Sequence, residues 1–192
     1  MKNEPVTLGD NKNMILEKYS SVWVNDFTNI KREIDHILAT LTYAVEHVGS
    51  TSVPNLDAKP IIDIDIVYFN ELDFEKIKLG LKKIGYYHNG NQGIEEREVF
   101  KRNGKILNEI LDTVKHHLYV CPVNSKALER HILSRNFLRK NDWARLKYQQ
   151  MKYEFAKLAN QDRKIYAALK EIHVNGFIDS IVEEEKMLVK IK

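Results

Sequence analysis

The 192-residue chain contains few of the residues that characterise several protein classes. Its single cysteine, Cys121, excludes a disulfide framework and a cysteine-rich zinc site. With only 8 glycines and 4 prolines, and with 43% hydrophobic residues, it is neither collagen-like nor of low complexity. No run approaches the roughly 20 apolar residues that cross a bilayer, and the polar first residues lack the apolar segment of a signal peptide. We therefore expect a soluble, cytoplasmic protein without a membrane partner.

The formal net charge of +3 conceals an uneven distribution of charge. Residues 126–170 hold 12 Lys or Arg and 4 Asp or Glu, a net +8, which leaves the rest of the chain at −5. Either these cations coat solvated helices, or one basic face attracts an anion such as a nucleotide or a nucleic-acid backbone. The segment lacks an RNA-binding signature and an interleaving of aromatic with basic residues, so a nucleic-acid partner is possible but not favoured.

The hydrophobic pattern predicts strands early in the chain and helices late, which indicates an α+β fold. In the helix expected over 141–159, the apolar contacts are predicted to come from Trp143, Leu146, Met151, Phe155 and Leu158. The last helix is expected to begin near residue 162 and to be interrupted, or to end, around Gly176. We expect one compact unit, in which a core of residues 1–122 carries a basic helical part of residues 123–192. Strands are predicted at 43–48, 61–69, 86–88, 99–102 and 117–121, and helices at 22–41, 72–84, 125–139 and 141–159.

Two carboxylates interrupt the most apolar of these predicted strands. Asp63 and Asp65 alternate with isoleucines, so both side chains lie on one face of the strand. Their like charges repel and break the apolar pattern, and a divalent cation would offset both costs. Mg²⁺ (or Mn²⁺) binds one or two protein carboxylates together with water and phosphate oxygens. The alternative is a half-exposed sheet on which both carboxylates simply face solvent.

A Gly-Ser turn precedes the carboxylate strand by a short distance. Gly49 lets a phosphate approach the backbone, and the hydroxyls and N–H groups of Ser50, Thr51 and Ser52 can hold its oxygens. A phosphate-gripping turn beside a carboxylate pair is the arrangement for phosphoryl or nucleotidyl transfer. The alternative is that these serines only cap a helix.

The stretch EHVGSTSVPNLDAKPIIDIDI, residues 46–66, resembles the GrpB family of the nucleotidyltransferase superfamily. The resemblance extends over roughly residues 6–182 and includes HHLYV at 116–120, Arg135 to Arg139, and two Y-x-x-x-K pairs. These pairs are Tyr148 with Lys152 and Tyr166 with Lys170. The family glycine after Val-Pro is Asn55 here, a residue that tolerates left-handed geometry.

The resemblance implies a nucleotidyltransferase-like mixed sheet with flanking helices. It also implies an active site in which Asp63 and Asp65 are catalytic metal ligands and the Gly-Ser turn binds phosphate. The superfamily adds a third carboxylate from a neighbouring strand, but the expected strand, 116–120, contains no acid. Asp112, Glu96 or Glu98 would complete the site, or the third ligand is absent.

Further side chains are candidates for the same site. Lys59 follows the turn and would neutralise phosphate charge, or it is a surface lysine beside a turn. On the strand without an acid, His117 and Tyr119 share a face. Four more cations are candidate phosphate ligands: Arg97, Lys101, Arg139 and Lys152.

Two functions remain open on the sequence. One is nucleotidyl transfer from a nucleoside triphosphate to an unknown acceptor, and the other is binding of a nucleotide or another phosphorylated small molecule without turnover. Both functions, and the oligomeric state, stay open at this point.

Overall fold

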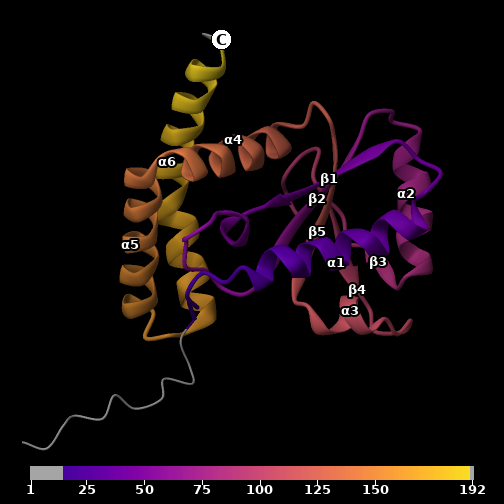
Figure 1. Ribbon diagram of the computed structural model, residues 1–192, viewed down its shortest axis with the longest axis horizontal. Coiled ribbons are helices and arrows are strands. Elements are labelled where there is room, and N and C mark those ends of the chain that lie inside the picture. The colour runs from indigo at the N-terminus through magenta and orange to yellow at the C-terminus, as the bar shows by residue number, and fades with distance from the viewer. Residues whose placement is uncertain (1–14, 191–192) are drawn as a thin grey trace, which may run out of the picture.

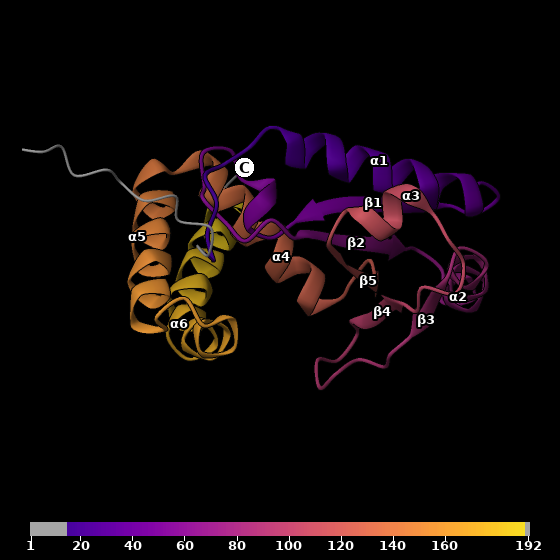
Figure 2. The same cartoon turned by 90° about the horizontal axis from the view of Figure 1, so that it is seen from below.

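The computed structural model describes residues 15–190 and shows a mixed sheet with helices on both faces (Figures 1 and 2). The expected α+β fold is therefore confirmed. The first 14 residues of the predicted core and the last two of the predicted helical part lie outside the described residues. Within the described range no helix is long and apolar enough to cross a membrane.

The sheet has five strands in the order β1-β2-β5-β4-β3. Its central strands, β2 and β5, pair in parallel, and the other neighbours pair antiparallel. The strands are β1 (Tyr43–Val48), β2 (Ile62–Tyr68), β3 (Tyr86–His88), β4 (Glu98–Arg102) and β5 (His116–Pro122). All five lie within a residue or two of their predicted positions.

One face of the sheet carries the main hydrophobic core. Ile62, Ile64 and Ile66 of β2 are at most 1% exposed and pack with the helices α1 (Val22–Ile37) and α2 (Asp73–Lys83). The short helix α3 (Glu109–Thr113), which the hydrophobic pattern did not predict, lies on the same side (Figure 2). Alternation along β2 therefore turns Asp63 and Asp65 to the opposite face.

The C-terminal helices lie beyond that opposite face. They are α4 (Lys126–Lys140), α5 (Asp142–Leu158) and α6 (Arg163–Lys190). α4 packs on β1 and β5, and all three helices share a second core with the loop after β1 (Figure 1). The expectation of a break near Gly176 is wrong, because α6 continues through this glycine to Lys190.

The predicted apolar stripe of α5 is wrong in part: Phe155 is buried and Met151 packs against the second core, as predicted, but the other three residues are exposed. Trp143, Leu146 and Leu158 are 53%, 58% and 71% exposed, whereas Tyr148 and Lys152 are buried. The helix therefore turns a partly polar stripe inwards.

Candidate active site

The Gly-Ser turn is built against the carboxylate strand. Gly49 has a φ of 69°, and the 3₁₀ turn η1 (Ser50–Ser52) follows it directly. A Cβ atom on Gly49 would lie 2.2 Å from Asp63 Oδ2, so only glycine lets the carboxylate rest on the turn. Asn55 adopts a φ of 61°, as expected for an asparagine in place of a glycine.

Most polar side chains of the turn are used to hold its shape. Thr51 is buried, and its hydroxyl donates to the carbonyl of Ile61 and lies 3.1 Å from His47 Nε2. The Ser52 hydroxyl donates to the carbonyl of Gly49 over 2.6 Å. Among the described residues Ser50 alone of the three forms no side-chain hydrogen bond, which leaves its hydroxyl available to a ligand.

Two arginines of α4 support the turn and β1. Arg139 donates from Nε and Nη2 to the carbonyl of Ser52 over 2.9 and 2.7 Å. Arg135 Nη1 donates to the carbonyl of His47 and to Glu46 Oε2. Arg139 therefore fixes the backbone of the turn, and it does not line either of the cavities beside the turn.

His47 anchors the turn from the opposite side. Its ring stacks on Phe27 at a centroid distance of 4.7 Å and is only 8% exposed. Burial, with help from Arg139, lowers the pKa of His47 to about 4.

This buried histidine predicts acid sensitivity. The unfolded chain binds a proton at His47 near pH 6.5, whereas the folded chain does so only near pH 4. The free energy of unfolding should therefore fall by about 2 kcal/mol between pH 7 and pH 5 on this account alone. Urea unfolding of the wild type and of His47→Gln at both pH values measures this, and an equal loss in the two proteins would contradict the assignment.

Each carboxylate of the pair is hydrogen-bonded to a histidine. Asp63 pairs in register with His117, whose Nδ1 lies 2.9 Å from Asp63 Oδ1. Asp65 is fully buried, and His131 of α4 donates from Nδ1 to its Oδ2 over 2.8 Å. No local sequence signal points to His131, which lies 66 residues from its partner.

None of the three acids considered from the sequence lies free beside Asp63 and Asp65 among the described residues. Asp112 is bound by Arg102, Glu98 by His88, and Glu96 lies exposed in the loop between β3 and β4. Within the described range no three His, Cys, Asp or Glu side chains form a group that could hold a metal ion.

The donor set nevertheless fits a cation that takes its remaining ligands from a bound molecule. Asp65 Oδ1 is buried without a hydrogen-bond partner in the part of the chain described by the structure. The Asp63 carboxylate stands two residues away on the same strand face, and 29% of its side chain is exposed. Two hard oxygen donors of this kind suit Mg²⁺ or Mn²⁺ completed by water and phosphate.

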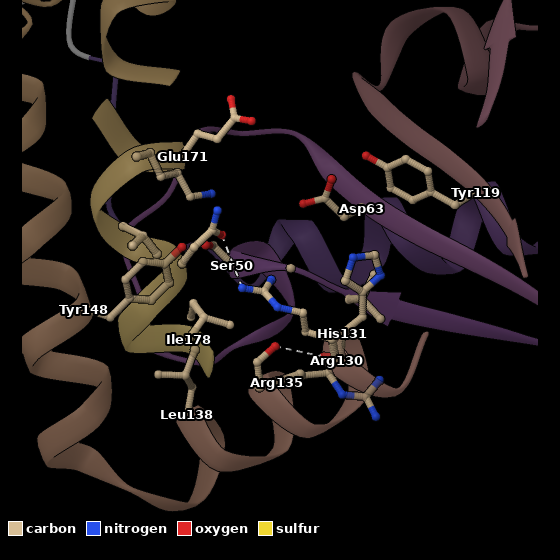
Figure 3. A pocket seen from close by; sticks show the side chains of 16 residues that line it. Ser50, Asp63, Tyr119, Arg130, His131, Arg135, Leu138, Tyr148, Glu171 and Ile178 are labelled. Carbon is tan, nitrogen blue, oxygen red and sulfur yellow. Dashed lines mark hydrogen bonds between the residues drawn. The ribbon is translucent and has the colours of Figure 1, made fainter. Parts of the chain in front are cut away.

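Two adjoining cavities meet at this site. Ser50, Asp63, Tyr119 and Lys170 line both of them. The first cavity, of about 230 Å³, runs between α4 and α6, where Figure 3 shows Asp63, His131 and Tyr148 around it. The second cavity, of about 300 Å³, lies between the turn and α6, with Ser50 and Thr51 on one side and Tyr166 on the other.

The second cavity, which we call the lysine lobe, is lined by Lys59, Lys152 and Lys170. Lys59 lies over the Tyr166 ring at 4.5 Å, and burial lowers its pKa. Lys152 is 1% exposed, donates to the carbonyl of Asp57, and has its pKa lowered by burial. Three lysines around one cavity point to an anionic ligand.

Lys170 is the lysine of the lobe whose charged form its surroundings favour. The oxygen of Tyr148 raises the pKa of Lys170, more than burial lowers it. The sequence analysis did not single out Lys170 as a site residue. The repeated Y-x-x-x-K pattern, which links Lys170 with Lys152, is the sequence feature that could have identified it.

The remaining predicted cations lie further along the sheet. Arg97 stacks on the Tyr119 ring at 4.7 Å. Lys101 is exposed on β4 and lines a hollow that also touches His117 and Tyr119.

Comparison with known proteins decides the family. The model of the GrpB protein family matches residues 13–183. The chain belongs to the GrpB family. It is 30% identical to the glutamate-rich protein GrpB of Alkalihalophilus pseudofirmus over 92% of this chain and 99% of that protein. It is also 30% identical to YqkA of Bacillus subtilis, of which the match covers 38%.

Solved structures agree on the fold of this GrpB-family chain. The crystal structure of GrpB from Enterococcus faecalis matches with a TM-score of 0.72 and 26% identity, over 88% of this chain and 98% of that one. Cid1, in complex with a UTP analogue, matches with a TM-score of 0.51 and 11% identity, over 73% of this chain and 42% of Cid1. The chain thus has a nucleotidyltransferase-like fold.

Proposed function

We propose that the cleft binds a nucleoside triphosphate with Mg²⁺ or Mn²⁺ and transfers its nucleotidyl group to an acceptor. The observation that carries this proposal is the Asp63 carboxylate resting on Gly49 at the mouth of the lysine lobe. One point of the cleft thus combines a cation ligand, a turn open to phosphate and three lysines.

The side chains divide the work in this proposal. Lys59 and Lys170 neutralise the β- and γ-phosphates, and the Ser50 hydroxyl donates to a phosphate oxygen. Asp63 and Asp65 hold the cation, which when bound neutralises charge on the triphosphate and polarises the α-phosphorus. The structures of Cid1 bound to a UTP analogue and to MgATP support a nucleotide ligand through the shared fold.

The proposed transfer is an in-line displacement. The acceptor hydroxyl oxygen bonds to the α-phosphorus as the bond from that phosphorus to the bridging oxygen breaks. Pyrophosphate leaves towards the lysine lobe, and the hydroxyl proton passes to solvent.

Binding without turnover is the second candidate. It is favoured by His117, which pairs with Asp63 on β5, the strand expected from the resemblance to carry a third acid. An imidazole carries no negative charge to offer a second cation, whereas a carboxylate does.

A screen of ATP, CTP, GTP and UTP with Mg²⁺ or Mn²⁺ tests the proposal. A nucleotide at 100 times its Kd stabilises a folded chain by about 2.7 kcal/mol, so the melting temperature should rise by roughly 5–10 °C. Lys59→Met and Lys170→Met should each raise the Kd of that nucleotide by about tenfold or more, because each removes a charge-assisted hydrogen bond. The exposed Lys82→Met on α2 is the matched control.

Pyrophosphate release, measured in the same samples, separates the two functions. Release supports transfer, and stabilisation without release supports the binding module. If no nucleotide shifts the melting temperature, both forms of the proposal are wrong.

A further inference from the structure

Part of the carboxylate face of the sheet is not covered by any helix of the described residues, 15–190. α4 lies against β1 and β5, whereas β4 and β3 continue beyond it (Figure 2). The helix that packs on β3 is α2, which belongs to the opposite face with Ile77 and Leu81. The carboxylate face of β3 and β4 is therefore open to a ligand that reaches Asp63 from the edge of the sheet.

A polar row crosses this open face. Asp63 pairs with His117, and Tyr87 pairs with Lys101. Because Phe100 pairs with Leu118 antiparallel, Lys101 lies next to His117. The row is therefore Asp63, His117, Lys101, Tyr87, and at about 4.8 Å per strand it is roughly 14 Å long.

The members of the row are accessible and chemically distinct. Tyr87 is 43% exposed, and 54% of the His117 side chain is exposed. Lys101 is exposed between these two rings. From the edge of the sheet towards Asp63, the row thus presents an aromatic ring, a cation and an imidazole in that order.

A further cation lies beside the row. Arg97 covers the Tyr119 ring, and its Nε is buried without a hydrogen-bond partner among the described residues. The open face therefore offers positive charge from Arg97 and Lys101, and an anion beside Arg97 would satisfy the unpaired Nε.

We infer that this row binds the acceptor, and that the acceptor carries a ring and a phosphate. Its ring stacks on Tyr87, its phosphate lies at Lys101 with Arg97 nearby, and its hydroxyl points past His117 to Asp63. A ring with an adjoining phosphate is nucleotide chemistry, supplied either by a free nucleotide or by the end of an oligonucleotide. This inference rests on the proposed function, since it gives the other reactant of the same transfer.

The test measures acceptor binding with the lysine lobe already filled. The full chain is titrated with AMP and with hexauridylate in the presence of Mg²⁺ and saturating inorganic tripolyphosphate. Stacking of a base on an aromatic side chain predicts that Tyr87→Ala raises the Kd of the bound probe at least about fivefold. Lys101→Met should have a similar effect, and Lys82→Met on the opposite side of the sheet should have none.

The outcomes separate this inference from the proposed function. Binding of AMP identifies a free nucleotide, binding of hexauridylate alone identifies an oligonucleotide end, and either result with the expected variant effects supports the inference. If neither probe binds, or if both variants bind the probe as the wild type does while tripolyphosphate still binds, the acceptor row is wrong and the proposed function stands. If tripolyphosphate itself does not bind, the proposed function fails first.

Discussion

Gly49→Ala should destabilise the fold by at least about 2 kcal/mol and abolish stabilisation by a nucleotide. An alanine at a φ of 69° costs about 1–2 kcal/mol on its own. Its Cβ would also lie 2.2 Å from Asp63 Oδ2, so the carboxylate or the turn has to move. Either movement separates the cation ligand from the phosphate-binding turn, because the two are in direct contact.

Gly93→Ala is the matched control for this variant. Gly93 has a φ of 82°, and a Cβ atom there would meet nothing within 4 Å. It should therefore show the backbone cost alone and keep the nucleotide effect. Urea unfolding with and without nucleotide measures both quantities, and a Gly49→Ala protein that matches Gly93→Ala would contradict the packed turn.

Asp57→Ala should lower the free energy of unfolding by about 3 kcal/mol at pH 7. The carboxylate is 4% exposed and accepts hydrogen bonds from the Tyr19 N–H, Lys18 Nζ and the Tyr153 hydroxyl. Removing it leaves the Tyr153 hydroxyl and the Tyr19 N–H without their acceptor. Because Tyr153 belongs to α5, the variant also loosens the C-terminal helices from the loop after β1.

The pH dependence of this loss follows from the same bonds. Burial opposes ionisation, but hydrogen bonds from Tyr153, Tyr19 and Lys18 outweigh it and lower the pKa of Asp57. The stabilisation is therefore present above the unfolded pKa, near 3.9, and is lost as the pH falls through the lower folded value. Asp179→Ala, whose side chain is 61% exposed in a surface pair with Arg130, is the control and should cost less than about 1 kcal/mol. Equal losses in the two variants at pH 7 would contradict this role of Asp57.

The strands could be predicted from the sequence because their signals are local. The isoleucines of β2 alternate with Asp63 and Asp65, so the period alone assigns the strand and the carboxylate face. The residue types at Gly49 and Asn55 likewise indicate a backbone with a positive φ angle.

Tertiary packing overrode the local signal in the C-terminal helices. Gly176 costs a helix about 1 kcal/mol, but Val174, Ile178 and Ile181 pack in the second core on both sides of it. In α5 the buried stripe contains Lys152, whose ammonium group is satisfied by a backbone carbonyl of the loop. Because a lysine stands in the buried stripe, hydrophobicity alone does not mark that stripe, and the prediction placed exposed Trp143 with the buried Phe155.

The site shows the same division between local and distant information. The turn and the carboxylates are 14 residues apart from Gly49 to Asp63 and share one motif. The pairing of His131 with Asp65 depends on how α4 crosses the sheet, and nothing near either residue in the sequence encodes it. Predicting it requires the packing of α4 on β1 and β5.

Calorimetric titration of Mg²⁺ with and without nucleotide is the sharpest test of the proposed cation site. Asp63 and Asp65 give the cation too few ligands alone, so the account predicts weak Mg²⁺ binding to the free chain and much tighter binding with the nucleotide that stabilises it. The nucleotide should in turn bind more tightly with Mg²⁺, by the same factor. Asp63→Asn should weaken this coupling and leave the chain folded. An Mg²⁺ affinity that no nucleotide changes, or an Asp63→Asn protein that keeps the full coupling, would contradict the account.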